Sequence, residues 1–98
     1  MTSEGSSVTV VIPTLNDAEA LRRLLPALRG FSRVAEIRVA DGGSRDGSQE
    51  TVELFEATWI CSETGRGRQM NAGAEGCTTD TLWFPVAVVY AIYRRARR

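Results

Sequence analysis

The stretch VTVVIPTLNDAEALRRLL, residues 8–25, sets the class of fold. Its first five residues are all β-branched, which is typical of a strand buried on both faces in a parallel sheet. Asn16 and Glu19 then form a capping-box pattern, with the amide oxygen serving the free N–H groups of a helix and Glu19 reaching back. The chain is therefore expected to begin with a strand followed by a helix.

The first helix is expected to be amphipathic. Leucines recur at the spacing of one helical face, namely Leu21, Leu24, Leu25 and Leu28. Pro26 lies within this pattern, and a proline inside a helix removes a hydrogen bond and clashes with the carbonyl four residues before it. A kink or an early end near Leu25 is therefore expected, with Gly30 closing the segment.

A second strand and a second helix follow. Residues 36–40, EIRVA, are expected to form the strand. A helix between two strands makes a βαβ unit, whose strands are parallel neighbours with a right-handed crossover. Asp46 or Ser48 can cap the second helix, which is expected to run to about Ala57 with Val52 and Phe55 facing inward.

The C-terminal part of the chain completes the sheet. TWIC, residues 58–61, predicts a third strand, and GRGRQMNAGAEG, residues 65–76, predicts a glycine-punctuated loop leading into a short helix. The apolar run over 82–93 is shorter than the roughly 20 residues of a membrane-spanning helix and is expected to be a buried strand or a surface-docking segment. These patterns predict one α/β domain over residues 7–98, with a mainly parallel sheet of three to four strands. Residues 1–6 are expected to be a disordered tail.

Composition excludes several classes of function. Twelve arginines balance twelve acidic residues, so no whole-molecule field favours nucleic acid. The sequence has neither histidine nor lysine, which excludes Ser-His-Asp hydrolysis, histidine metal sites, Schiff-base chemistry and the lysine of a phosphate-binding P-loop. Cys61 and Cys77 do not form a Cys-x-x-Cys pair, so two buried free thiols in a reduced, cytoplasmic compartment are expected.

Polar segments follow the first two expected strands, PTLND at 13–17 and DGGSRDG at 41–47. In an open α/β sheet, ligands bind outside the carboxyl ends of the strands. The two segments are therefore expected to lie side by side and to form a binding site.

The residue types in these segments allow two interpretations. Asp17 or Asp41 could accept hydrogen bonds from a base or ribose, and Gly42 and Gly43 let the backbone come close to a ligand. The same residues also fit an ordinary turn and an ordinary helix cap. A dinucleotide-binding Rossmann motif is disfavoured, because its glycines should follow the first strand directly.

Arginines form two further groups. Arg66 and Arg68, flanked by glycines, present planar guanidinium forks that match phosphate oxygens, so they are candidates for clamping a diphosphate. A solvated basic loop is the alternative. The four arginines within residues 94–98 are expected to be a solvated tail, with contact to anionic lipid as the alternative.

Three blocks in this order carry a resemblance to a known family: VTVVIPTLNDAEALRRLL, then EIRVADGGSRDGS, then GRGRQMNAGAEG followed by Asp80. Over about residues 7–84 the chain resembles the N-terminal nucleotide-binding part of a family 2 glycosyltransferase of the GT-A fold. The resemblance implies a three-layer, Rossmann-like half-domain. It also implies binding of a nucleoside-diphosphate sugar, of the UDP or GDP type, and transfer of the sugar to an acceptor.

The resemblance also implies roles for individual residues. Those that would line the nucleoside site are Pro13, Thr14, Leu15 and Asp17. Asp41 would hydrogen-bond the base, beside Gly42. Those that match the family's basic loop near the nucleotide are Arg66, Arg68 and Asn71. No catalytic residue is assigned.

Two departures from the family pattern matter. Gly42 stands where many relatives have a second Asp, so contacts to base or ribose are expected to be fewer or differently placed. Relatives hold a divalent metal, Mg²⁺ or Mn²⁺, through an Asp-x-Asp motif after LWF, but this chain continues as PVAV over residues 85–88. Without these carboxylates no metal site is expected, and metal-assisted transfer is expected to be disabled.

The expected function is therefore nucleotide-sugar binding by an incomplete, truncated glycosyltransferase domain that is not catalytically competent alone. An alternative is a non-catalytic nucleotide-binding or membrane-docking module, cytoplasmic and peripheral at a membrane, that docks through residues 82–93 and the terminal arginines. A third possibility is a remnant that does not fold stably, because a parallel sheet without its later strands leaves an open edge and an uncovered apolar face.

Overall fold

The computed structural model describes residues 7–79 and 81–84, which form alternating strands and helices. In chain order the elements are β1 (Val8–Thr14), α1 (Ala18–Arg29), β2 (Val34–Asp41), α2 (Ser48–Leu54), β3 (Thr58–Cys61), α3 (Arg66–Ala74) and β4 (Thr81–Trp83). This is the order expected from the sequence. The expected tail over residues 1–6 and most of the apolar run lie outside the described residues.

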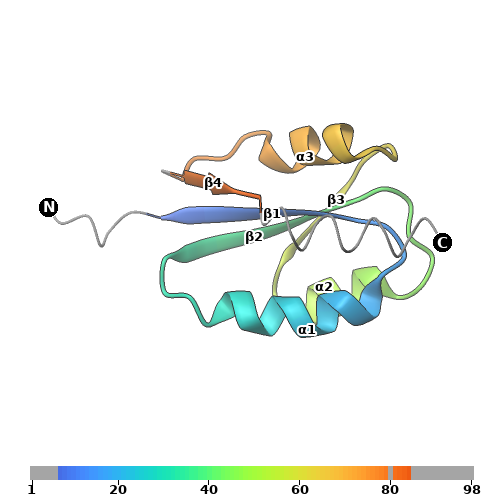
Figure 1. Cartoon of the computed structure of the whole chain (residues 1–98), viewed down its shortest axis with the longest axis horizontal. Coiled ribbons are helices and arrows are strands. Elements are labelled where there is room, and N and C mark those ends of the chain that lie inside the picture. The colour runs from blue at the N-terminus through green and yellow to red at the C-terminus, as the bar shows by residue number, and fades with distance from the viewer. Residues whose placement is uncertain (1–6, 80, 85–98) are drawn as a thin grey trace, which may run out of the picture.

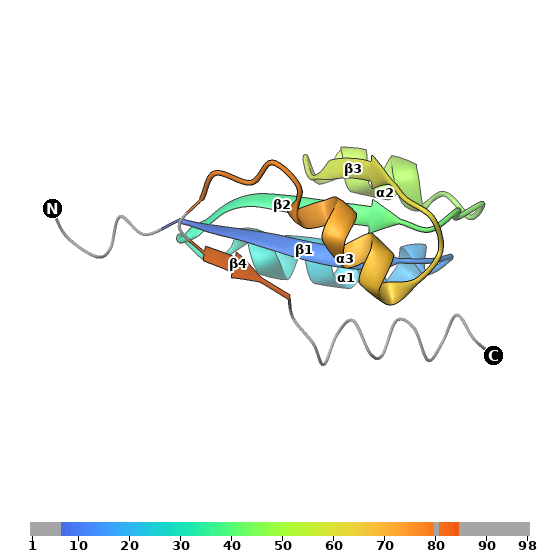
Figure 2. The same cartoon turned by 90° about the horizontal axis from the view of Figure 1, so that it is seen from above.

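The four strands form one parallel sheet in the order β3-β2-β1-β4 (Figures 1 and 2). β1 and β2 occupy the centre, with Thr14 opposite Asp41 at their carboxyl ends. This register brings the segments that follow the two strands to the same edge of the sheet. The prediction of an α/β fold with a parallel sheet of three to four strands is confirmed.

Helices cover both faces of the sheet, which gives three layers. α1 and α2 lie on one face and α3 lies on the other (Figure 1). The core under α1 and α2 joins Val10 and Ile12 of β1 to Leu21, Leu25 and Val52 of the helices, all of them buried. Burial of such a side chain contributes about 1.5–3 kcal/mol, so this core fixes the two helices on the sheet.

The amino end of α1 differs from the expected capping box. The N-cap is Asp17 rather than Asn16, and its Oδ1 accepts a hydrogen bond from Ala20 N at 3.3 Å. Glu19 does not reach back to the cap but pairs with Arg23 one turn later, at 3.1 Å. The cap was therefore predicted one residue too early, because Asn16 is engaged with another segment of the chain.

Pro26 does not end α1, which continues to Arg29 and is closed by Gly30. The proline is exposed, while Leu25 and Leu28 on the core side are buried. A proline inside a helix costs about 3 kcal/mol, and burial of several leucines on the same helix outweighs that cost. The expected early end near Leu25 was therefore wrong.

α2 is shorter than expected, because it ends at Leu54 rather than near Ala57. Glu56 adopts a positive φ of 60°, which turns the chain out of the helix and into β3. Val52 is buried and Phe55 is half-buried, as the amphipathic pattern predicts.

The two cysteines are free, but they are not both buried. Cys61 is exposed and Cys77 is half-buried, so the expectation of two buried thiols was wrong. Cys61 ends β3, which is an edge strand of the sheet and is therefore covered less than the two central strands.

β4 forms the other edge of the described sheet, and its three residues are exposed. The described part of the apolar run is therefore not a buried strand, which was one of the two expectations for it. Leu82 and Trp83 line a hollow of about 320 Å³ with Val8, Phe31 and Val34, at the amino ends of β1 and β2. Phe31 is 58% exposed and Trp83 is 43% exposed, so this end of the sheet presents apolar surface to solvent.

Candidate functional site

Hydrogen bonds join the segments that follow β1 and β2 at the carboxyl edge of the sheet. Asn16 donates its backbone N–H to Ser44 Oγ at 2.8 Å, and its Oδ1 accepts the N–H of Arg45 at 2.8 Å. Asn16 holds a positive φ of 52°, a conformation that asparagine adopts more readily than most residues. The prediction that PTLND and DGGSRDG lie side by side is confirmed.

Asp46 links the same two segments through the starts of two helices. Its Oδ2 accepts the Ala18 N–H at 3.0 Å, and its Oδ1 accepts the Ser48 N–H at 3.1 Å and the Ser48 Oγ–H at 2.5 Å. Desolvation alone would raise the pKa of Asp46, but the hydrogen bonds from Ser48 and Ala18 outweigh it and lower the pKa below its ordinary value of 3.8. Asp46 or Ser48 was expected to cap α2, but the N-cap is Gly47, which lies between them. Asp46 accepts N–H groups from the first turns of both helices, Ala18 in α1 and Ser48 in α2.

Asp41 is the last residue of β2 and is buried beneath the second segment. Its Oδ2 accepts the N–H groups of Gly43 and Ser44 at 2.8 and 2.7 Å, and its Oδ1 accepts the Ser44 hydroxyl. The carboxylate therefore stabilises the turn over residues 42–44, in agreement with the interpretation of this segment as an ordinary turn. A carboxylate offers about four acceptor positions, so capacity for a further donor remains. The predicted contact with a base stays a prediction.

The predicted nucleoside residues of the first segment differ in exposure. Pro13 and Thr14 are buried in β1, Leu15 is half-buried, and Asp17 is buried as the cap of α1. The Thr14 carbonyl accepts the N–H of Gly42 at 3.1 Å, which ties the two segments together again. The Thr14 hydroxyl is buried and has no hydrogen-bond partner among the described residues, which is unusual for a buried polar group.

The basic segment reaches the same edge through the residues just before α3. Thr64 Oγ1 donates to the carbonyl of Gly42 at 2.6 Å. Arg66 and Arg68 lie in the first turn of α3 and are exposed. Arg68 forms an ion pair with Glu63 at 2.9 Å, which is worth little because both side chains are largely in solvent. The structure therefore brings the start of the helix that carries the two arginines beside the segment after β2.

Asn71, also predicted for the nucleotide site, lies farther along α3. It is exposed and stands two positions after Gln69, which is buried against the sheet. Two residues correspond to a rotation of about 200° around a helix, so Asn71 faces away from the sheet. Thr64, in contrast, bonds directly to Gly42 beside Asp41.

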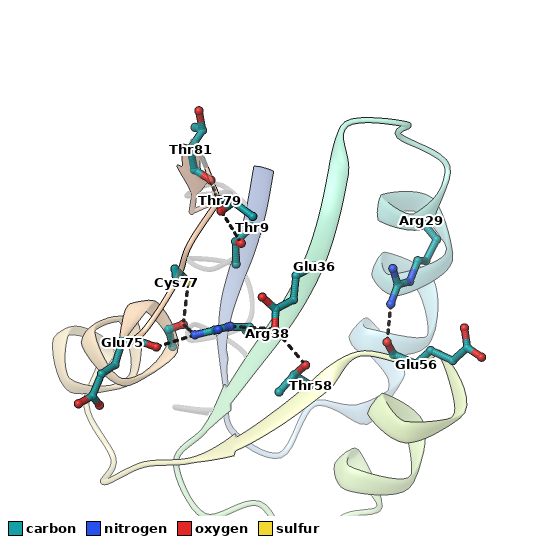
Figure 3. Close-up of polar contacts among 11 residues, drawn as sticks. Thr9, Arg29, Glu36, Arg38, Glu56, Thr58, Glu75, Cys77, Thr79 and Thr81 are labelled. Atoms are coloured by element: carbon teal, nitrogen blue, oxygen red, sulfur yellow. Dashed lines mark hydrogen bonds and ion pairs between the residues drawn. The ribbon is translucent and has the colours of Figure 1, made fainter. Parts of the chain in front are cut away.

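The far end of α3 is held against the sheet by Arg38 of β2 (Figure 3). Its Nη1 donates to the carbonyls of Gly73 at 3.2 Å and Glu75 at 2.7 Å, at the helix end where carbonyls lack helical partners. Its Nε lies 3.1 Å from the carboxylate of Glu36. Gly73 packs closely on Val11 of β1. These contacts hold the C-terminal end of α3 against the sheet.

Sequence reasoning missed three residues that build this edge, namely Asn16 as a bridge between loops, Ser44 and Gln69. Gln69 is fully buried. One signal in the sequence points to it, because Gln69 stands four residues before Gly73 and so shares its helical face. A polar residue on the face that packs against a sheet needs hydrogen-bond partners there.

The carboxylates at this edge do not form a metal site. The oxygens of Asp41 and Asp46 accept hydrogen bonds from N–H and hydroxyl groups, and Asp17 caps α1. Within residues 7–79 and 81–84, no three His, Cys, Asp or Glu side chains are grouped so that they could hold a metal ion. These residues therefore do not fit the divalent metal of the family. Residues 85–88, where relatives have Asp-x-Asp, lie outside the described part of the chain.

None of the helices in the described part of the chain has the length and apolar character needed to cross a membrane. The longest, α1, has 12 residues, whereas a span needs about 20. Only residues 82–84 of the segment expected to dock on a membrane are described.

A three-layer α/β domain whose polar loops meet at the carboxyl ends of two central parallel strands has the architecture of a nucleotide-binding domain. The sequence model of Glycosyl transferase family 2 matches residues 9–85, and the chain belongs to this family. The resemblance noted from the three sequence blocks is thereby confirmed. A search of curated protein sequences finds no match.

The fold is similar to that of glucosyl-3-phosphoglycerate synthase from Mycobacterium tuberculosis, solved in complex with Mn²⁺, UDP and glucosyl-3-phosphoglycerate. The TM-score is 0.69 at 18% sequence identity, and the match covers 83% of this chain and 34% of that chain. The chain therefore spans about a third of the length of that synthase. The likeness shows the Rossmann-like GT-A fold.

Proposed function

We propose that the chain binds the nucleoside-diphosphate part of a nucleotide sugar at the carboxyl ends of β1 and β2, as the donor-binding part of a glycosyltransferase. The observation that carries this proposal is the pair of hydrogen-bonded segments after the two strands, joined by Asn16 and Asp46. Ligands of open α/β sheets bind at such an edge. Membership of glycosyl transferase family 2 and the presence of UDP in the similar synthase support a nucleotide sugar as the ligand.

The base is assigned to the surface formed by residues 13–17 and 41–44. Asp41 retains acceptor capacity for an N–H group of the base, because about one of its four acceptor positions is not used by the turn. Gly43 has a positive φ of 112°, and a Cβ built on it would meet nothing within 4 Å. The space beside Gly43 is thus open, and the absence of a side chain lets a ligand approach the backbone.

The diphosphate is assigned to the side of the site nearest α3. Thr64 brings the first turn of this helix beside Gly42, and Arg66 and Arg68 are exposed there. Guanidinium groups match phosphate oxygens in geometry, and the amino end of a helix favours negative charge. Both features support binding of UDP or GDP over the uncharged nucleoside.

Sugar transfer by this chain alone is not part of the proposed function. Transfer from a nucleotide sugar develops charge on the leaving diphosphate, which relatives stabilise with a metal ion. The sequence has PVAV over residues 85–88 in place of Asp-x-Asp. The carboxylates of Asp41 and Asp46 serve the loops and helix ends instead. We therefore expect nucleotide binding without release of sugar.

Calorimetric titration of the full chain with UDP, GDP and uridine, each with and without Mn²⁺, tests this function. UDP or GDP is expected to bind, and Mn²⁺ is expected to leave the affinity unchanged. Arg66→Gln should weaken diphosphate binding about ten-fold through loss of a charge-assisted hydrogen bond, while uridine binding stays unchanged. Arg22→Gln, which removes an exposed arginine from α1, is the matched control and should change neither.

Each outcome bears on a separate part of the proposal. Failure of the wild-type chain to bind UDP or GDP would overturn the nucleotide function. Binding that requires Mn²⁺ would contradict the assignment of the carboxylates. An equal loss of uridine and UDP binding in Arg66→Gln would show that this arginine does not act on the phosphates. Release of sugar by the purified chain would contradict the lack of catalysis.

A further inference from the structure

Gln69 makes hydrogen bonds with three separate parts of the candidate site. Its Nε2 donates to the carbonyl of Thr14 at 2.9 Å and to the carbonyl of Ala40 at 2.8 Å. Its Oε1 accepts the N–H of Gly65 at 3.0 Å. The three partners determine the amide orientation, because a flipped amide would face two carbonyls with its oxygen and an N–H with its NH₂ group.

These partners lie at or next to the points where the polar segments and α3 begin. Thr14 ends β1, Ala40 lies one residue before the end of β2, and Gly65 is the N-cap of α3. The side chain is fully buried, so solvent does not compete for these bonds. One amide therefore links the first polar segment, the second polar segment and the start of the basic helix.

Gly42 packs directly against this side chain. A Cβ built on Gly42 would lie 2.9 Å from Gln69 Oε1, 3.0 Å from its Cδ and 3.2 Å from its Nε2. The contact with Oε1 is too short for a real Cβ and the other two are tight, so a residue larger than glycine at position 42 would have to shift the Gln69 amide against its partners. The glycine at position 42 and the glutamine at position 69 are therefore a matched pair.

We propose that Gln69 is a positioning residue, which sets the relative placement of the two polar segments and the arginines of α3 without touching the nucleotide. Gly42 has no side chain and so leaves the space that the Gln69 amide occupies. The inference deepens the proposed function, because the distance between base surface and diphosphate arginines would depend on Gln69. Packing then explains why position 42 is a glycine here, where many relatives have Asp. The amide of Gln69 fills the volume that a side chain at position 42 would need.

Amide exchange measured without nucleotide tests the placement directly. Gln69→Met keeps the length of the side chain but removes its donors and acceptor. It is expected to speed exchange at Gly65 and Gly42 at least about ten-fold, because the first amide loses its acceptor and the second bonds to the Thr14 carbonyl that Gln69 also holds. Gln49→Met, a change at an exposed position of α2, is the matched control and should leave these amides unchanged.

A double-mutant cycle tests the pairing of Gly42 with Gln69 and remains informative if Gln69→Met folds poorly. Gly42→Ala alone is expected to speed exchange at Gly65, because the added methyl displaces the amide. In a Gln69→Ser background the same change should have little further effect. Gly67→Ala, at a position where a Cβ meets nothing within 4 Å, is the glycine control.

The nucleotide readout separates positioning from mere stability. Loss of stability alone would leave the ratio of UDP to uridine affinity unchanged in the folded protein, whereas displaced arginines should lower that ratio about ten-fold in Gln69→Met. Unchanged exchange at Gly42 and Gly65 in Gln69→Met, or strictly additive effects in the cycle, would overturn the proposal. If the wild-type chain binds no nucleotide, the proposed function fails, while the exchange measurements still decide whether Gln69 places the three segments.

Discussion

At the scale of single residues, the candidate site is assembled by polar side chains that bond to backbone groups of another segment. The Asn16 side chain accepts the N–H of Arg45, the Ser44 hydroxyl accepts the N–H of Asn16, and Asp46 accepts the N–H of Ala18. Each such bond contributes about 0.5–1.5 kcal/mol to stability, so no single one holds the loops alone. Their combined effect is that both loops are tied down before a ligand binds.

The buried hydroxyl of Thr14 provides a first prediction at this scale. Thr14→Val is expected to keep or raise the free energy of unfolding, within about 1 kcal/mol, because it removes a buried hydroxyl that has no partner among the described residues. Thr9→Val is the matched control on the same strand. It should lose about 1 kcal/mol, because the buried Thr9 hydroxyl bonds to Thr79 Oγ1 at 2.7 Å (Figure 3). Urea unfolding measures both, and equal losses would contradict the difference between them.

Asp46 provides a prediction about pH. Its pKa is lowered in the folded chain, so the ionised carboxylate stabilises the fold above the ordinary value of 3.8, and this contribution is lost as the pH falls through the lowered pKa. Asp46→Asn should therefore unfold more easily at neutral pH, by up to about 1 kcal/mol, because the asparagine amide has one acceptor oxygen for N–H groups that the carboxylate accepts with two. The difference from the wild type should shrink in acid.

The measurement is urea unfolding of the wild type and Asp46→Asn from neutral pH to well below the pKa. Glu75→Gln removes an exposed carboxylate at the end of α3 and serves as the control for a general change in charge. A difference between the wild type and Asp46→Asn that stays constant into acid would show that the charge of Asp46 contributes nothing to stability.

At the scale of elements, the placement of α3 on the sheet depends on close approach. A Cβ on Gly73 would come far inside van der Waals contact with Val11 Cγ1, and Ala40 lies beside it. Arg38 then bonds to the carbonyls at the end of the helix. The glycine and the arginine together let the backbone of α3 lie directly on β1 and β2.

Two glycines of α3 are expected to respond oppositely to alanine. Gly73→Ala should destabilise the fold by about 1–3 kcal/mol, because the methyl group forces α3 away from Val11. Gly67→Ala should be neutral or stabilise by up to about 1 kcal/mol, because alanine favours the helix and nothing lies within 4 Å of the new methyl. Thermal unfolding measures both changes. Similar effects at the two positions would contradict the close packing of Gly73.

At the scale of the whole molecule, the two ends of the sheet differ in character. The carboxyl end carries polar loops joined by hydrogen bonds. The amino end carries the apolar hollow lined by Phe31, Leu82 and Trp83. Apolar groups in such a concave surface attract other apolar molecules. The proposed nucleotide site and the apolar surface are therefore at opposite ends of the domain.

The apolar hollow should bind a dye that reports exposed apolar surface. Phe31→Gln is expected to lower the fluorescence of bound dye, because Phe31 is 58% exposed and lines the hollow. Leu54→Gln is the matched control, since Leu54 is 75% exposed but lies on α2 outside the hollow. Equal losses in the two variants, or no loss in either, would contradict the hollow as the place of dye binding.

Much of the fold could be predicted from local patterns. The β-branched run over 8–12 and the leucine spacing in 21–28 predicted a parallel α/β sheet. A strand buried on both faces gives a continuous run, and a helix buried on one face gives a periodic pattern of apolar residues. The adjacency of the two polar segments followed from the parallel order of β1 and β2, since parallel strands end at the same edge. The sequence by itself therefore determined the fold class and the edge that carries the site.

Only the tertiary structure decided which atoms hold that edge together. Asn16 does not cap α1 but bonds to Ser44, which lies 28 residues away in the sequence. Gln69 bonds to Thr14, 55 residues away. α1 continued past Pro26 because burial of its leucine face outweighs a local cost. Such choices depend on groups that are distant in sequence and meet only in the folded chain, so no local pattern records them.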